Sequence, residues 1–173
     1  PAGLKPYQNV RAAGEDLKQG EVLCQKGKKL NSADIGILAA AGISHLPVYD
    51  TLNIACFSSG DELVSIGKPL ACGQIYDSNR YMLAGLLADP RYVCVDLGII
   101  SDNPHQLLNG IKQAAQTNNV IISTGGASVG EADYIQDILG KLGKVYLWKI
   151  AVKPGKPLIF GKIGDCYYFG FPG

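Results

Sequence analysis

The feature that most constrains the fold is an alternation of strand-like and helix-like segments from about Asp50 onward. Runs rich in β-branched and aromatic residues predict strands, and segments whose apolar residues recur every three to four positions predict helices. We expect strands at 52–57, 92–100, 120–123, 144–152, 158–162 and 166–169, with helices at about 77–89, 103–115 and 132–142. This alternation is typical of an α/β fold with a mostly parallel sheet, here ending in a mixed or antiparallel edge.

Each predicted helix carries apolar residues about one turn apart, and these define the face expected to pack on the sheet. They are Met82, Leu83, Leu86 and Leu87 in the first helix, Leu107, Leu108, Ile111 and Ala115 in the second, and Tyr134, Ile135, Ile138 and Leu139 in the third. In the second helix, Asn103 followed by Pro104 is a strong start signal, since a capping residue precedes proline at the first helical position.

The first third of the chain has a different texture. Residues 1–8 are rich in Pro and Gly and indicate a linker or a cut end. Residues 9–48 predict a small, partial N-terminal α/β subdomain with short strands at 21–24 and 28–30 and a helix over 33–41. The stretch Asn31-Ser32-Ala33-Asp34 can cap that helix, and Gly42 can end it. We therefore expect residues 49–173 to form the main domain.

The composition excludes several classes of protein. The 173 residues suffice for one main core, and no apolar run is long enough to span a bilayer. A net charge of +1 gives no electrostatic footprint for nucleic acid. The five cysteines are dispersed without a C-x-x-C pair, which predicts buried free thiols in a reducing compartment. We expect a soluble, cytoplasmic protein that binds neither nucleic acid nor membrane.

Acidic residues follow three successive predicted strands. Asp61 and Glu62 come after the first strand, Asp102 after the second, and Asp133 after the third. Ligands of open α/β sheets bind beyond the carboxyl ends of the strands, so these carboxylates should share one rim. Carboxylates beside a phosphate site commonly hold Mg²⁺, although helix capping or solvation explains each acid taken singly.

Two further segments can bind anions. The loop 124–130 between the third strand and its helix has adjacent glycines and Ser128, as a phosphate cradle requires, although a tight turn with a serine cap has the same pattern. Lys149 and Lys153 fall on one face of an extended segment, and prolines flank Lys156 in the next turn. Ordinary solvated lysines are the alternative interpretation.

Four stretches, in their order along the chain, resemble a known fold. They are Ser59-Gly60-Asp61-Glu62-Leu63, Ile75-Tyr76-Asp77-Ser78-Asn79, the segment 125–134 with the letters GGASVGEADY, and Lys153-Pro154-Gly155-Lys156-Pro157. They resemble the three-layer molybdopterin-binding (MoaB/Mog-like) fold shared by MoeA-type molybdenumtransferases, the gephyrin E-domain and the smaller molybdopterin adenylyltransferases. The letters NVRAAGED at 9–16, the helix 32–42 and the ending GFPG at 170–173 favour the MoeA-type branch. The resemblance extends from about Asn9 to the last residue.

The resemblance implies an activity and its participants. Family members take adenylylated molybdopterin, release AMP and insert molybdate into the dithiolene in the presence of Mg²⁺. By resemblance the catalytic residues are Glu62, Asp102, Asp133, Lys149 and Lys153, of which the three acids are also the metal ligands. By resemblance the cofactor-binding residues are Ser59, Gly60, Asp61, Asp77, Ser78, Gly125, Gly126, Ser128, Gly130, Lys156 and Pro172. A homodimer and contact with the molybdopterin adenylyltransferase are also implied.

The sequence departs from the family pattern at four positions. Ser59 stands where threonine is usual, Ala127 where valine is, Asn103 where a second aspartate is, and Ala12 where proline is. Ser59 keeps a hydroxyl, whereas Asn103 removes one charge from the expected metal rim. Because the family continues beyond Pro172-Gly173, we expect a fragment without the C-terminal domain and with little activity alone. The alternatives are an adenylyltransferase on the same fold and a gephyrin-like receptor-binding scaffold.

Overall fold

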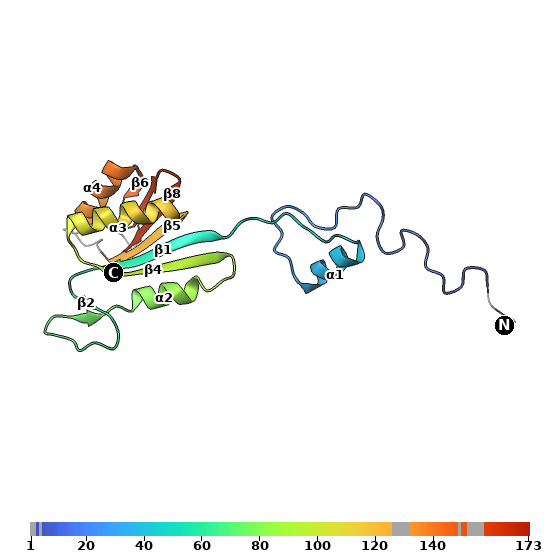
Figure 1. Cartoon of the computed structure of the whole chain (residues 1–173), viewed down its shortest axis with the longest axis horizontal. Coiled ribbons are helices and arrows are strands. Elements are labelled where there is room, and N and C mark those ends of the chain that lie inside the picture. Colours follow the sequence, from blue (N-terminus) through green and yellow to red (C-terminus); the bar gives the residue numbers. More distant parts are fainter. Residues whose placement is uncertain (1–2, 4, 126–131, 149, 152–157) are drawn as a thin grey trace. The chain divides into compact units, whose positions relative to one another are not determined.

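The computed structural model describes residues 3, 5–125, 132–148, 150–151 and 158–173, with only the backbone described at 132 and 133 (Figure 1). The chain divides into two compact units, Pro1–Tyr49 and Asp50–Gly173, each of which is treated by itself below. Within the described residues, no helix has the length and apolar character needed to cross a membrane.

The first unit contains one helix, α1 (Ser32–Ala40), among its described residues. Asn31 caps it through a capping box: its side chain accepts from the amides of Ala33 and Asp34, and the Asp34 carboxylate accepts from the Asn31 amide. The chain then turns at Gly42, whose φ of 76° is the left-handed conformation that glycine adopts readily. Both helix signals were predicted from the sequence.

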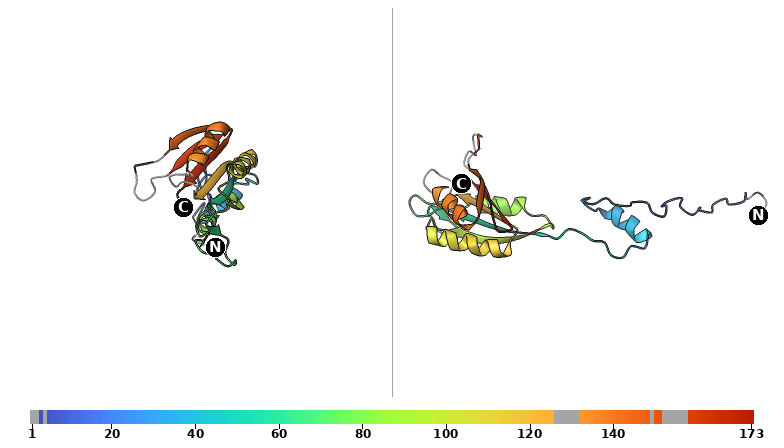
Figure 2. Two further views of the ribbon diagram at one scale, coloured as in Figure 1. Left: turned by 90° about the vertical axis from the view of Figure 1, so that its left-hand side faces the viewer. Right: turned by 90° about the horizontal axis from the view of Figure 1, so that it is seen from above.

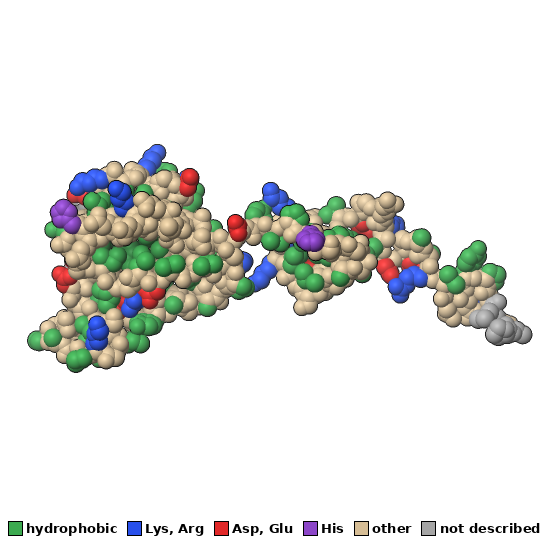
Figure 3. All heavy atoms as spheres, viewed as in Figure 1, with side chains coloured by type: hydrophobic (Ala, Val, Ile, Leu, Met, Phe, Trp, Pro, Cys, Tyr) green, Lys and Arg blue, Asp and Glu red, His purple; other side chains and the backbone are tan. Residues whose placement is uncertain are grey.

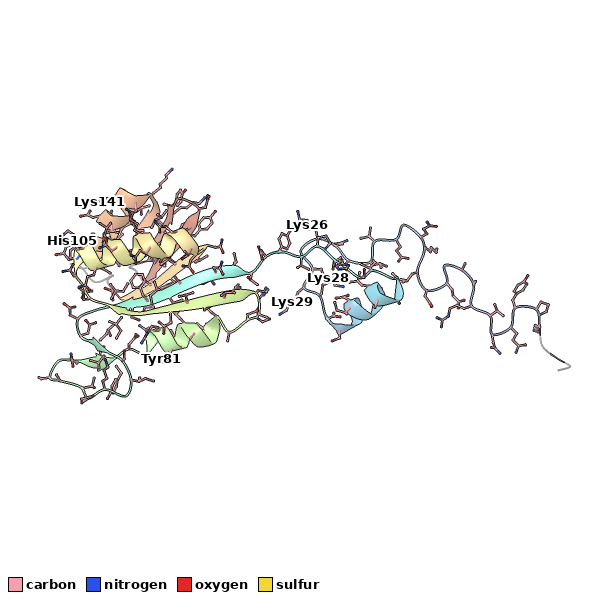
Figure 4. All side chains as sticks on the ribbon, viewed as in Figure 1. Lys26, Lys28, Lys29, Tyr81, His105 and Lys141 are labelled. Atoms are coloured by element: carbon pink, nitrogen blue, oxygen red, sulfur yellow. The ribbon has the colours of Figure 1, made fainter. Side chains whose placement is uncertain are left out.

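The prediction of two short strands before α1 is wrong. Residues 21–24 and 28–30 are coil that follows two turns, in which the amide of Glu21 bonds to the carbonyl of Lys18 and that of Lys28 to the carbonyl of Gln25. Lys28 instead donates to the buried Asp34 carboxylate at 2.6 Å, and Figure 4 labels it in the segment that precedes α1. Local turn hydrogen bonds thus take the place of the strand pairing that was expected here, since a short isolated pair of strands is only marginally stable.

The second unit is built on a six-stranded sheet with the order β4-β1-β5-β8-β7-β6. Its strands are β1 (Leu52–Ser59), β4 (Tyr92–Ile100), β5 (Val120–Gly125), β6 (Lys144–Trp148), β7 (Ile159–Ile163) and β8 (Cys166–Phe171). The first four strands in the sheet order are mutually parallel, whereas β7 is antiparallel to both β8 and β6. The mostly parallel sheet and its mixed end confirm the predicted fold class.

Helices cover both faces of this sheet. The chain leaves β1 through α2 (Asn79–Leu86) to reach β4, then crosses back through α3 (Pro104–Thr117) to β5 on the other side of β1. Crossovers are right-handed, so a reversal of direction places the two helices on opposite faces, as Figure 2 shows. Helix α4 (Ala132–Leu142) packs beside α3, and the result is the expected three-layer architecture.

A small parallel pair, β2 (Leu63–Val64) and β3 (Ile75–Tyr76), lies between β1 and α2 in the chain and was not predicted. Its strands have two residues each, which is too short for a periodicity to register.

The main core lies between the sheet and the α3–α4 face. Its buried residues include Phe57, Ile121 and Tyr168 from the strands and Leu107, Ile111, Ile135, Ile138 and Leu139 from the helices. This confirms most of the predicted faces of α3 and α4, although Tyr134 is exposed.

The predicted face of α2 is wrong at two positions. Only Leu83 is buried, whereas Met82 and Leu86 are 58% and 71% exposed. The helix has two turns and touches the sheet mainly at β1, so a single position faces inward.

Candidate active site at the carboxyl end of the sheet

The site follows from where the chain changes direction. Strand β1 connects toward β4 on one side, whereas β5, on its other side, leads onward to α4. Neighbouring strands whose connections diverge leave a crevice beyond their carboxyl ends, where ligands of α/β sheets bind. Here the crevice is flanked by Ser58 and Ser59, which pair with Thr124 and Gly125.

A compact hydrogen-bonded loop forms this rim. The Ser59 hydroxyl, on a residue only 1% exposed, donates to Asp102 Oδ1 at 2.5 Å. The Asp61 amide donates to Asp102 Oδ2 and the Asp102 amide donates to Asp61 Oδ1, both at 3.2 Å. The structure therefore brings together three residues that the sequence assigned to the site: Ser59 at the end of β1, Asp61 in the loop after it, and Asp102 in the loop after β4.

Glu62 turns back over Gly60. A Cβ atom placed on Gly60 would lie 2.6 Å from both carboxylate oxygens of Glu62, and the φ of Gly60 is 150°. Only glycine at this position lets the Glu62 carboxylate lie against the loop backbone. Glu62 is exposed and thus reaches the same loop from the solvent side.

Gly125 lies directly against the end of β1. Its φ is 81°, and a Cβ there would stand 2.0 Å from the carbonyl oxygen of Ser59. Thr124 pairs with Phe171, so Pro172 and Gly173 follow directly at the same edge, with a Cβ on Gly173 only 3.2 Å from Gly125 Cα. Gly125 and Pro172, both expected to bind cofactor, thus lie at the rim.

Asp77 lies below the rim and is 1% exposed. Its Oδ1 accepts from the Ser58 hydroxyl at 2.9 Å, and that hydroxyl is also 3.0 Å from Thr124 Oγ1. Its Oδ2 accepts from Arg80 Nε at 2.9 Å. Asp77, expected at the cofactor, therefore bonds within the protein, while Ser78 is exposed and makes no side-chain bond to the start of α2.

Sequence reasoning missed Ser58, Arg80 and Asp96, and it named Thr124 only as the first residue of the glycine loop. Arg80 comes three residues after Asp77 at the start of a predicted helix, the spacing of an ion pair, which was the available signal. Burial lowers the pKa of Arg80, but bonds and charge from Asp96, and then from Asp77, outweigh that effect and raise it. Arg80 is thus a permanent cation.

Asn103 has a structural use that accounts for one departure from the family pattern. It is the N-cap of α3, and its side-chain oxygen accepts from the amides of His105 and Gln106 at 2.9 and 3.2 Å. Figure 4 labels His105 at this end of α3. The Asn103 oxygen is therefore committed to the helix and not to the rim.

Several predicted site residues lie outside the described residues. They are Gly126, Ser128, Gly130, Lys149, Lys153 and Lys156. Asp133 falls in the first turn of α4, but its side chain is also outside the described part. Among the described residues, no group of three or more His, Cys, Asp or Glu side chains could hold a metal ion. The three-acid metal site therefore stays a prediction.

The described residues also line two grooves, one in each unit. One of about 350 Å³, between α3 and β4, is lined by Val95, Leu97, Ile100 and residues of α3, and Figure 3 shows hydrophobic side chains gathered there. Its lining contains no titratable group, so it offers no acid–base chemistry. The other, of about 380 Å³, lies within the first unit and includes Lys26 and Lys28 in its wall.

Two family descriptions match the sequence. Residues 55–173 match the family described as "Probable molybdopterin binding domain", and residues 1–42 match the "MoeA N-terminal region (domain I and II)". The crevice and the three-layer fold thus define a protein of the molybdopterin-binding class. The chain belongs to this family, and its first 42 residues are similar to the N-terminal region of MoeA proteins.

Individual relatives agree. The chain is 43% identical over 169 residues to the molybdopterin molybdenumtransferase of Haemophilus influenzae and 39% identical over 173 residues to that of a Nostoc species, covering 98% of this chain in both cases. It spans 42% and 40% of those relatives' lengths.

Solved structures agree in fold. A MoeA protein from Pyrococcus horikoshii superposes with a TM-score of 0.80 at 32% identity, over 92% of this chain and 40% of its own. MoaB from Thermus thermophilus, at a TM-score of 0.55 and 14% identity, covers 71% of this chain and 82% of its own, and shares the fold alone.

Proposed function

We propose that the protein containing this chain is a molybdopterin molybdenumtransferase. The observation that carries the proposal is the Ser59–Asp102–Asp61 loop at the crevice of a sheet from this family. In the reaction, water adds to one phosphorus of adenylylated molybdopterin, the P–O bond to the other phosphate breaks, and AMP leaves. The two dithiolene thiols then bind molybdate, and one oxo ligand departs as water with their protons.

In this proposal the rim acids would hold the reacting water and Mg²⁺. Asp102 is held by Ser59 and Asp61, so its carboxylate needs little reorganisation when substrate binds. Glu62 lies on the solvent side of the same loop, where it faces incoming substrate. Asp133 would approach from the start of α4.

Magnesium would be held by these carboxylates together with substrate phosphate. Mg²⁺ in phosphate sites is commonly bound by one or two carboxylates plus substrate oxygens, so Asp102 with Glu62 or Asp133, the acids implied as metal ligands, would suit it. Each Asp102 oxygen accepts one hydrogen bond and keeps a lone pair. When bound, the ion would neutralise charge on the phosphoanhydride.

The anionic parts of the substrates need positive partners. We assign the pterin phosphates to the glycine loop that begins at Gly125, since amides at the start of a helix bind phosphate. Lys149 and Lys153 are assigned to pyrophosphate or molybdate, and Lys156 to the pterin phosphate, on the basis of family resemblance.

We also propose a homodimer formed through α2 and the β2–β3 pair. Five apolar side chains of these elements are exposed, namely Ile75, Tyr76, Tyr81, Met82 and Leu86. Contact with a second copy would remove these apolar side chains from water. Exposed apolar residues that are scattered singly are normal, whereas several together mark an interaction surface. Sedimentation of the Met82→Glu/Leu86→Glu variant should then show monomer where wild type shows dimer, and a wild-type monomer would refute this surface. We also propose contact with the molybdopterin adenylyltransferase, on the basis of family resemblance, and assign no residues to it.

The adenylyltransferase and receptor-scaffold alternatives are not favoured, because the Haemophilus influenzae and Nostoc relatives, each matched over 98% of this chain, carry the transferase name.

The test measures AMP and molybdenum cofactor formed from adenylylated molybdopterin and molybdate by the full-length protein to which this sequence belongs. We expect Mg²⁺-dependent turnover that falls at least about a hundredfold in Asp133→Asn, since lost electrostatic contacts in active sites cost this much. Asp137→Asn, one turn further along α4, is the control and should keep its activity. Tight pterin binding without turnover would contradict the proposal.

A further inference from the structure

Arg80 joins two carboxylates from different elements of the larger unit. It lies in the first turn of α2, where its Nε donates to Asp77 Oδ2 at 2.9 Å. Its Nη1 donates to both carboxylate oxygens of Asp96 on β4, at 3.0 Å each. The Arg80 side chain is 11% exposed and that of Asp77 is 1% exposed, so water screens their contact much less than it screens a surface ion pair. Arg80 therefore ties the start of α2 to β4.

Asp96 marks the start of a bulge in β4. Strands β1 and β4 pair in step up to Cys56 and Asp96, but Ser58 then pairs with Ile99, so β4 contains one extra residue. Gly98, inside the bulge, has a φ of 80°, and its amide donates to Asp96 Oδ1 at 2.9 Å. The Asp96 carboxylate thus links the bulge backbone to the Arg80 guanidinium.

The bulge decides which residue of the next loop reaches β1. After it, Ile100 pairs with Ser59, and Asp102 arrives two residues later to accept the Ser59 hydroxyl and the Asp61 amide. Without the extra residue, each later position of β4 would shift by one and point its side chain to the opposite face of the sheet. Asp102 would then no longer meet Ser59.

The other arm of Arg80 reaches the opposite side of the crevice. Asp77, which Arg80 holds, also accepts from the Ser58 hydroxyl, and that hydroxyl contacts Thr124 at the end of β5. One cation is therefore linked by hydrogen bonds to the rim ends of β1 and β5 and to the bulge of β4.

We propose that Arg80 is a positioning residue of the active site. By bridging Asp77 and Asp96 it holds the β4 bulge, and through the bulge it places the Asp102 carboxylate against Ser59 and Asp61. It touches no reacting group itself. The catalytic part of this inference rests on the proposed transferase function, whereas the placement of Asp102 is measurable without it.

The structural arm of the test is amide hydrogen exchange in Arg80→Met and Asp96→Asn. We expect exchange at Gly98, Asp61 and Asp102 to be at least about tenfold faster in both variants, because local opening of these bonds becomes easier. The amide of buried Ile121 should stay within about twofold of wild type. Arg91→Met is the matched control, since Arg91 also makes two bonds to one carboxylate, that of Asp89, and should leave all four amides unchanged.

Two results would overturn the proposal. One is unchanged exchange at Asp61 and Asp102 in Arg80→Met, and the other is an equal acceleration at Ile121, which would indicate a general loss of stability. If Arg80→Met does not fold, Asp96→Asn decides, because Asp96 is 60% exposed and its loss leaves the core intact.

The catalytic arm compares kcat and KM in the full-length protein. Misplacement of Asp102 should lower kcat by about tenfold or more in Arg80→Met while KM for adenylylated molybdopterin stays within about twofold, because only transition-state contacts are lost. A raised KM with unchanged kcat would refute the catalytic part. Absence of turnover in the wild-type protein would refute the proposed function instead. In that case the hydrogen-exchange measurement would still decide whether Arg80 positions Asp102.

Discussion

Asp61 and Asp102 bind each other reciprocally: each backbone amide donates to the carboxylate of the other, both at 3.2 Å. The two residues are 41 positions apart and come from loops after different strands. These two bonds hold the two acidic side chains side by side, where the loops after β1 and β4 meet.

Removing the Ser59 hydroxyl should loosen this loop. Ser59→Ala leaves the Asp102 oxygen without its buried donor, and we expect a loss of about 1–2 kcal/mol in the free energy of unfolding. Urea denaturation measures it. Ser101→Ala is the control, because the Ser101 hydroxyl bonds to Gln106 at an exposed position. Equal losses in the two variants would show that the Ser59–Asp102 contact has no special weight.

Gly125 should not tolerate a side chain. Gly125→Ala combines a φ of 81° with a Cβ 2.0 Å from the Ser59 carbonyl oxygen. We expect a loss of more than about 2 kcal/mol in thermal or urea unfolding, since strained backbone alone costs about 1–3 kcal/mol. In contrast, Gly140→Ala in α4 meets no atom within 4 Å and should gain about 0.5–1 kcal/mol. An unchanged unfolding free energy in Gly125→Ala would contradict this close approach of Gly125 to Ser59.

Asn103 offers a test of its capping role. Asn103→Ala should cost about 1 kcal/mol of unfolding free energy because the α3 amides lose their acceptor. Asn103→Asp keeps the acceptor and adds a favourable charge at the helix start, so it should match or exceed wild-type stability by up to about 1 kcal/mol. If Asn103→Asp is as unstable as Asn103→Ala, capping by the side-chain oxygen is not its role.

The cysteines should differ in their reaction with iodoacetamide. Burial raises the pKa of Cys56, as do the neighbouring Cys94 and Asp96, to about 11, and burial raises that of Cys166 to about 11. At pH 8 both should therefore be modified far more slowly than the exposed Cys72 and Cys94.

The same two thiols make stability depend on alkaline pH. Their folded-state pKa lies above the unfolded value, so folding binds the proton more tightly, and stability present below about pH 9 is lost as the pH rises toward 11. A melting temperature that rises over this window would contradict the assigned burial. Cys56→Ala/Cys166→Ala should lessen the loss.

The sequence was most informative where one local pattern determines one structure. Asn103-Pro104 fixes the start of α3, and the residues from Tyr92 to Ile100 form the strand with the predicted bounds. The order of acids after strands also predicted that Asp61 and Asp102 would share a rim, because parallel strands end at the same edge.

Other features depend on contacts that no local pattern records. The sequence around Asp77 would be the same whether its side chain bound a ligand or a buried arginine. Only the folded structure shows that Ser58 and Arg80 bond to it. The α2 residues Met82 and Leu86 have helical spacing, but a short helix at the edge of the sheet buries just one side chain. The predicted strands at 21–24 and 28–30 failed because pairing needs a partner strand.

The bulge in β4 has a second effect, on self-association. Strand β4 is an edge of the six-stranded sheet, and Val93 and Val95 on it are exposed. A regular apolar edge invites pairing with the edge of another molecule and leads to aggregation. The extra residue near Gly98 and the charged Asp96 interrupt this edge, and both devices are known to block such pairing. Loss of the Asp96 charge should thus lower the protein concentration at which aggregation begins.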